Sequence, residues 1–234
     1  LKQRAAKFMP NIKVDVIPNG VELDNYFPIE RTADSGQRIE NNFTLIKLIT
    51  SGRLSSTKRV NMLIEAVDIL IKRGYKIKFR IAGDGSLSDS LKQLVSQKNL
   101  NSCIEMLGRV EPANMPDLYR DSDIYISATM QEGMSNSMLE ALACGLPVVT
   151  TYCEGVEELI TDTGIVTKHA HADLLADAIK TLADNRDKLK QMSLAARKRA
   201  EMFNWQNAAE KYLNYYKATI DKTKTFRKIR EKKI

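Results

Sequence analysis

Short, continuously apolar runs alternate with longer stretches of helical periodicity along most of this chain, and this alternation narrows the choice of fold more than any other property of the sequence. Runs of this continuous kind suit strands that are covered on both faces of a sheet. Strands are predicted at residues 44–50, 77–82, 104–107, 123–128, 147–151 and 164–167. Helices are predicted at residues 60–72, 87–98, 112–119, 137–144, 156–160 and 173–183. The order of these elements predicts an α/β fold with a doubly wound parallel sheet.

The two ends of the chain depart from the alternation. Residues 186–216 are predicted to form extra C-terminal helices without strands. Their aromatic side chains are expected to pack back onto a neighbouring layer; they belong to Trp205, Tyr212, Tyr215 and Tyr216. Residues 14–28 predict one short strand that runs into a turn, and the polar stretch 30–42 is interpreted as a hinge and linker.

These differences predict three parts: an N-terminal strand with an interdomain linker (1–42), a ligand-binding α/β domain (43–185), and C-terminal helices with a basic tail (186–234). The chain begins at Leu1, in a segment that already reads as structured. We therefore expect it to be part of a longer polypeptide.

The net charge of +7 is concentrated at the C-terminus, because residues 217–234 hold eight Lys or Arg and only two Asp or Glu. Such a tail is compatible with a solvated terminus and with contact to anionic lipid or nucleic acid. A charge confined to the tail disfavours a nucleic-acid-binding core.

Cysteine and histidine usage predicts a reducing cytoplasm and no metal site. The three cysteines lack metal-ligand or C-x-x-C spacing. His169 and His171 are two residues apart and are not part of a metal-ligand pattern, so they are interpreted as solvated loop residues. The longest apolar run, 139–149, is interrupted by polar, glycine and proline residues and is not expected to span a bilayer.

The segment SGRLSSTKR, at residues 51–59, lies between the first predicted core strand and the first core helix. In doubly wound sheets anions bind outside the carboxyl ends of the strands, where helix N-termini present free N–H groups. Gly52 would let the backbone approach a ligand closely, while Arg53 and Lys58 would flank a diphosphate. A turn with two solvated cations is an equally acceptable interpretation of this spacing.

The segment EGMSNSMLE, at residues 132–140, also follows a strand and opens a helix. Carboxylates eight residues apart on one helix would be about 12 Å apart, too far for a paired acid and base, so Glu132 and Glu140 should have separate tasks. One would face a sugar ring and the other a ribose. Alternatively, Glu140 closes a capping box with Ser137, since residues 137–140 have the form S-x-x-E.

Six segments follow one another along the chain: VIPNGVELDNYF, SGRLSSTKRVNMLIEA, IAGDGSL, LGRVEPANMPDLYRDSDIYISA, EGMSNSMLEALACGLPVV and FNWQNAAEKYLNYY. Together and in this order, they closely resemble the C-terminal, donor-binding domain of retaining GT-B glycosyltransferases of family 4, also called group 1. The resemblance covers most of the chain. It implies a Rossmann-like sheet that binds a nucleoside-diphosphate sugar, and transfer of that sugar with retention to a glycan or lipid-linked acceptor.

The resemblance also implies a role for each matching residue. Glu132 would be the catalytic residue, facing the donor sugar near the reacting carbon. The diphosphate would be held by Gly52, Arg53 and Lys58. The remaining donor contacts would come from the backbone of Gly133, Met134 and Ser135 to the sugar and phosphate, from Glu140 to the ribose, and from Arg109 and Val110 to the base. No metal or other cofactor is expected.

Two substitutions depart from the family pattern without removing a proposed contact: Arg59 stands where glycine is common, and Thr129 where serine is common. The acceptor-binding N-terminal domain of the family has no counterpart here, so the chain alone is expected to be inactive. By family analogy we expect a bacterial enzyme of polysaccharide or lipopolysaccharide assembly. It would be cytoplasmic, and peripheral at the inner face of the plasma membrane through its tail.

Other functions on the same architecture remain open at this point. One is a nucleotide-sugar-binding regulatory module without catalysis, and another is a sugar-nucleotide epimerase or phosphorylase. The chain shows no lysine with the long surrounding insertion that a phosphorylase would use for pyridoxal phosphate. Retention of Arg53, Lys58, Glu132 and Glu140 argues weakly against a purely regulatory module, since binding alone would also keep them.

Overall fold

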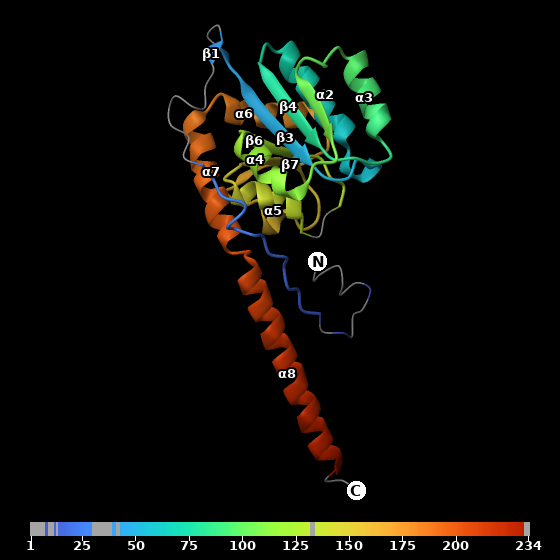
Figure 1. Cartoon of the computed structure of the whole chain (residues 1–234), viewed down its shortest axis with the longest axis vertical. Helices are drawn as coiled ribbons and strands as arrows, with labels where there is room; N and C mark the ends of the chain where they lie inside the picture. Colours follow the sequence, from blue (N-terminus) through green and yellow to red (C-terminus); the bar gives the residue numbers. More distant parts are fainter. Residues whose placement is uncertain are drawn as a thin grey trace.

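The computed structural model describes residues 14–29, 39–40, 43–131 and 134–231, together with Phe8 and Ile12. Its centre is a parallel sheet of six strands in the order β5-β4-β3-β6-β7-β8 (Figure 1). The strands are β3 (Ile46–Ser51), β4 (Ile77–Ala82), β5 (Ile104–Gly108), β6 (Ile124–Ser127), β7 (Val148–Thr151) and β8 (Gly164–Thr167). Each predicted strand is confirmed, with ends shifted by at most two residues. The α/β fold with a doubly wound parallel sheet is therefore correct.

Helices cover both faces of the sheet because strand residues alternate between two hydrophobic cores. On β3, Leu48 lies in one core and Ile49 in the other. The first core is completed by α2 (Val60–Lys72), α3 (Ser88–Gln97) and α6 (Ala172–Ala183). The second is completed by α4 (Met115–Arg120), which follows the 3₁₀ turn η2 (Pro112–Asn114), and by α5 (Asn136–Ala143), η3 (Val156–Glu158) and α7 (Arg186–Glu201).

Two local predictions were wrong. The helix expected at 156–160 is only the 3₁₀ turn η3. The short strand expected within 14–28 does not form, because this segment pairs with no sheet strand: Val21 makes a single bridge to Asn204, and its N–H donates to the Phe203 carbonyl (2.8 Å). In the interpreted linker, β1 (Ile39–Glu40) pairs antiparallel with β2 (Phe43–Thr44), and residues 30–38 and 41–42 lie outside the described residues.

The C-terminal helices behave differently from one another. Helix α7 packs against α5, and its Ala196 and Ala200 are fully buried. Helix α8 (Trp205–Glu231) leaves the body of the molecule and extends away from it (Figure 1). Its aromatic residues are exposed, so the prediction that they pack back was wrong; these are Trp205, Tyr212, Tyr215 and Tyr216. No helix within the described ranges is both long enough and apolar enough to cross a membrane.

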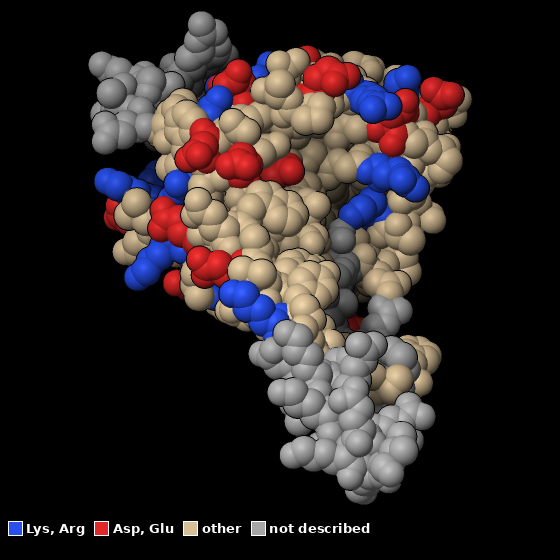
Figure 2. Space-filling model, turned by 60° about the horizontal axis from the view of Figure 1, so that its bottom comes forward, with Lys and Arg blue, Asp and Glu red and all other residues tan. Residues whose placement is uncertain are grey.

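Surface charge on the body is mixed. In Figure 2, acidic and basic residues alternate over the visible face rather than separating into regions of one sign. This agrees with the concentration of net positive charge in the C-terminal residues of the sequence.

Candidate functional site

A cleft opens at the carboxyl ends of the central strands. The chain runs from β3 through β4 to β5 on one side and from β6 through β7 to β8 on the other, so the strand order reverses between β3 and β6. Ligands of doubly wound sheets bind outside the strands at such a reversal. The cleft here has a volume of about 510 Å³, within the range typical of small-molecule sites.

The structure brings most of the predicted site residues to this cleft. Seven of them line it: Gly52, Lys58, Arg109, Val110, Met134, Ser135 and Glu140. Arg53 lines a narrower adjoining hollow, which shares Gly52, Lys58 and Ser135 with the cleft. Glu132 and Gly133 lie outside the described residues, so the structure gives no position for the predicted catalytic carboxylate.

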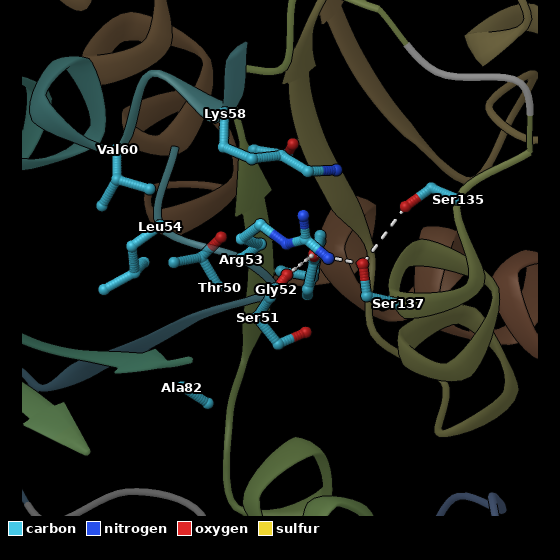
Figure 3. A pocket seen from close by; sticks show the side chains of 12 residues that line it. Thr50, Ser51, Gly52, Arg53, Leu54, Lys58, Val60, Ala82, Ser135 and Ser137 are labelled. Carbon is cyan, nitrogen blue, oxygen red and sulfur yellow. Dashed lines mark hydrogen bonds between the residues drawn. The ribbon is translucent and has the colours of Figure 1, made fainter. Parts of the chain in front are cut away.

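The turn after β3 is held in place by the turn after β4. The N–H of Gly52 donates to the Ala82 carbonyl (2.9 Å), and that of Leu54 donates to the Asp84 carbonyl (3.0 Å). Gly52 has φ +137°, a conformation that L side chains rarely adopt. Figure 3 shows the side chains of Arg53 and Lys58 extending from this turn toward Ser135 and Ser137 on the other side of the hollow. The cationic side chains of Arg53 and Lys58 and the N-terminal end of α5 thus face the same hollow.

The start of α5 corrects the predicted capping box. The helix begins at Asn136, and its N-cap is Ser135, whose Oγ accepts from the Met138 N–H (3.4 Å). Ser137 is already inside the helix, and its Oγ bonds instead to the Tyr125 hydroxyl (2.9 Å). Glu140 therefore does not return to Ser137. The free N–H groups of this helix start face the cleft, where the helix dipole favours an anion.

Glu140 is held by a tyrosine that the sequence did not single out. The hydroxyl of Tyr119, on α4, donates to Glu140 Oε2 (3.0 Å) and lies 2.7 Å from Ser51 Oγ. Tyr119 is fully buried. Burial raises the pKa of the Glu140 carboxyl, while the hydrogen bond from Tyr119 opposes part of that rise. Glu140 is thus a partly desolvated carboxylate with one fixed donor and free acceptor capacity, as a ribose-binding group requires.

This raised pKa predicts a pH-dependent stability. A carboxyl whose pKa is higher in the folded than in the unfolded state stabilises the fold below its unfolded pKa, and that contribution is lost as pH rises through the folded pKa. We expect Glu140→Gln to melt at a higher temperature than the parent at pH 7.5, because the amide carries no charge that burial would desolvate.

The same pair should differ much less near pH 4, where Glu140 is largely protonated in both states. Melting curves of parent and variant across this pH range test the expectation. A gap in Tm that is constant with pH would show that charge burial at Glu140 is not its cause.

Sequence reasoning also missed Asn19. It lines the cleft although it precedes the sheet by many residues, and its Nδ2 donates to Asn136 Oδ1 (2.9 Å) at the start of α5. The segment before the sheet thus contributes to the cleft wall, and the only hint was its match to the family pattern. Within the described residues, no three His, Cys, Asp or Glu side chains are grouped so that they could hold a metal ion.

The sequence matches the family Glycosyl transferases group 1 over residues 35–199. D-inositol 3-phosphate glycosyltransferase of Pseudarthrobacter chlorophenolicus is 29% identical over 90% of this chain and 51% of its own length. The GPI3 subunit of phosphatidylinositol N-acetylglucosaminyltransferase of Saccharomyces cerevisiae is 25% identical over 87% of this chain and 45% of its own length. The chain therefore spans about half the length of these curated relatives.

Solved structures agree on the fold. TarM of S. aureus, in complex with ligands that include UDP, superposes with a TM-score of 0.77 at 23% identity, over 92% of this chain and 42% of TarM. Anabaena HepE with UDP superposes with a TM-score of 0.74 at 20% identity, over 87% and 57% of the two chains. The family match covers well over half of the sequence and the sheet has the arrangement seen in these glycosyltransferases of the GT-B fold. This chain belongs to the Glycosyl transferases group 1 family.

Proposed function

We propose that the chain is the C-terminal, donor-binding half of a retaining glycosyltransferase of family 4, with residues 43–185 as its nucleotide-sugar-binding domain. The observation that carries this proposal is that Lys58, the start of α5 and Glu140 line one cleft at the reversal of strand order, with Arg53 in the hollow that adjoins it. A nucleoside-diphosphate sugar has a matching order of groups: a diphosphate between a ribose and a hexose.

In this proposal the diphosphate lies over the Gly52 turn between Arg53 and Lys58, opposite the start of α5. Glu140, fixed by Tyr119, accepts hydrogen bonds from the ribose hydroxyls. The backbone at Arg109 and Val110, on the far side of the cleft, faces the base. The residues that open α5 face the hexose, and Glu132 stands near its reacting carbon.

The chemistry follows from the charge that develops during transfer. The bond from the anomeric carbon to the diphosphate oxygen breaks, a bond to the acceptor oxygen forms, and the acceptor hydroxyl releases its proton to the departing diphosphate or to solvent. Negative charge accumulates on the leaving nucleoside diphosphate, where Arg53, Lys58 and the helix dipole stabilise it. The Gly52 turn is hydrogen-bonded to the turn after β4, so the backbone that carries Arg53 and Lys58 is positioned before the donor arrives.

The comparisons suggest which ligands to try first. Structures of TarM, GtfA and HepE contain UDP, so UDP and its sugars are the first donors to test. The names of two relatives include inositol phosphate or phosphatidylinositol, which makes such acceptors a reasonable first panel. Action in bacterial polysaccharide or lipopolysaccharide assembly, at the cytoplasmic face of the membrane, is part of the same proposal and rests on analogy and on the basic tail.

The proposed division of labour is tested by reconstitution. The chain alone should bind a nucleotide sugar and transfer nothing, because the acceptor is not positioned and water is not excluded. Adding an acceptor-binding N-terminal half from a group 1 enzyme, covalently joined before residue 14, should restore transfer, with the anomeric configuration of the donor kept in the product by NMR. Epimerisation of the donor by the chain alone would refute the proposal.

A further inference from the structure

Arg59 adopts a backbone conformation that its side chain disfavours. It has φ +47° and ψ +43°, in the left-handed region, and it is the N-cap of α2. Among the described non-glycine residues only Arg59 and Asn99 have positive φ. Asparagine tolerates this region and arginine does not, which explains why glycine suits the position after Lys58. The contacts of the Arg59 side chain must therefore offset the cost of this backbone conformation.

The side chain of Arg59 joins the ends of two strands. Its Nε donates to the Ala128 carbonyl (2.6 Å), and its Nη2 donates to the Thr129 carbonyl (3.1 Å) and to Thr151 Oγ1 (3.2 Å). Ala128 and Thr129 directly follow β6, and Thr151 ends β7. Within the part of the chain that the structure describes, none of its acceptors is a carboxylate: the guanidinium donates to two backbone carbonyls and one threonine hydroxyl.

A second contact joins the loop after β6 to the turn that carries Arg59. The N–H of Met130 donates to the Thr57 carbonyl (2.8 Å), so the loop after β6 is tied twice to residues 57–59. Lys58, which lines the cleft, lies between these two attachment points. In the sequence, segment 128–130 is followed closely by Met134 and Ser135, which line the cleft just before α5. The turn that carries Lys58 and the loop after β6 are therefore fastened to each other by the Arg59 guanidinium and by the hydrogen bond between Met130 and Thr57.

We propose that Arg59 is a positioning residue for the donor sugar: its guanidinium holds the loop after β6 against the diphosphate-binding turn, and so favours the sugar-bearing donor over the bare nucleotide. This inference rests on the proposed function. Arg59 lines neither the cleft nor the adjoining hollow, so it acts on the donor through the loop rather than by contact.

The test compares two affinities in each protein, for UDP-sugar and for UDP, by calorimetry on the full chain. Arg59→Gly removes the guanidinium and relieves the left-handed backbone, and Arg59→Asn removes it with a side chain that tolerates this conformation. Both variants should bind UDP within about threefold of the parent, while the ratio of the UDP-sugar Kd to the UDP Kd rises about tenfold, as expected when ordered contacts to the sugar are lost. GDP and ADP pairs replace UDP if the parent prefers them.

The ratio of the two Kd values distinguishes positioning from a general structural role. If Arg59 had only a structural role, its loss would weaken the binding of both ligands equally and leave this ratio unchanged. Asn99→Gly is the matched control: it changes the other left-handed non-glycine residue, at the opposite end of the sheet, and should leave the ratio as in the parent. An unchanged ratio in both Arg59 variants, or its full restoration in Arg59→Lys, overturns the inference. If the parent binds no nucleotide, the proposed function itself fails and the inference falls with it.

Discussion

Replacing Arg53 and Lys58 together with alanine should weaken the binding of a nucleoside diphosphate by about 100-fold or more. Each cation can make a charge-assisted contact with the diphosphate, and such contacts contribute roughly 1.5–3 kcal/mol each. Two of them correspond to about 10²–10⁴ in affinity. Arg53 is exposed and Lys58 only half-buried, so their removal should leave the fold unchanged. Calorimetric titration with UDP, GDP and ADP measures the effect.

A charge-matched control separates this site from nonspecific attraction. Lys92→Ala plus Lys190→Ala removes the same charge from exposed positions on α3 and α7, which do not line the cleft. Its affinity should stay within about twofold of the parent, because exposed distant charges are screened by salt. Repeating both titrations with excess EDTA should change neither affinity, since the proposed site uses no metal. Equal weakening in the two double variants would mean that net charge, and not the Gly52 turn, governs binding.

Gly83→Ala should destabilise the protein by about 3 kcal/mol or more, and lower Tm by roughly 6–12 °C. A Cβ on Gly83 would lie 1.9 Å from the Gly52 carbonyl oxygen, and the residue has φ +149°. The clash is with backbone, so a side chain cannot move aside to relieve it. The substitution must push the two turns apart, which should also weaken nucleotide binding at the Gly52 turn.

Gly108→Ala is the comparison that isolates the clash. Gly108 also has a positive φ of +65°, but a Cβ there meets nothing within 4 Å. The free energy of unfolding of this variant should therefore fall only by the cost of an alanine in the left-handed conformation, about 1–2 kcal/mol. Urea unfolding of both variants, followed by circular dichroism, gives the two losses. Equal losses would show that the close approach of Gly83 to Gly52 is not what stabilises these turns.

The sheet was predictable because strands covered on both faces must be apolar throughout, and this signal is local. The predicted strands and the observed β3 to β8 differ only at their ends. Strand order was not contained in the pattern. The cleft became predictable only through the rule that ligands bind at the carboxyl ends of such strands. In the structure, Lys58 lines this cleft and Arg53 lines the adjoining hollow.

Predictions about the hydrogen-bond partners of individual side chains failed. The capping box at Ser137 and Glu140 is reasonable from local chemistry, but Ser135 takes the cap. Glu140 bonds to Tyr119, which is far away in the sequence, so spacing could not reveal the pair. Arg59 is a similar case, because the carbonyls that hold it belong to two other strand ends.

The ends of the chain show the same limit. The spacing of the aromatic residues in α8 is that of a helix with one apolar face, but spacing does not identify what the face contacts. In the structure this helix extends away from the body and its tyrosines are exposed (Figure 1). A strand was likewise expected before the sheet from its apolar residues, yet a strand needs a partner edge, and among the described residues Val21 makes only one isolated bridge, to Asn204.

The most direct measurement is an experimental structure of this chain with a bound nucleoside diphosphate. The account predicts that the two phosphates lie over the Gly52 turn, within hydrogen-bonding distance of the Arg53 guanidinium, the Lys58 ammonium and the N–H groups at the start of α5, with the ribose hydroxyls at Glu140. A diphosphate bound anywhere else on the chain, with Arg53 and Lys58 turned to solvent, would contradict it.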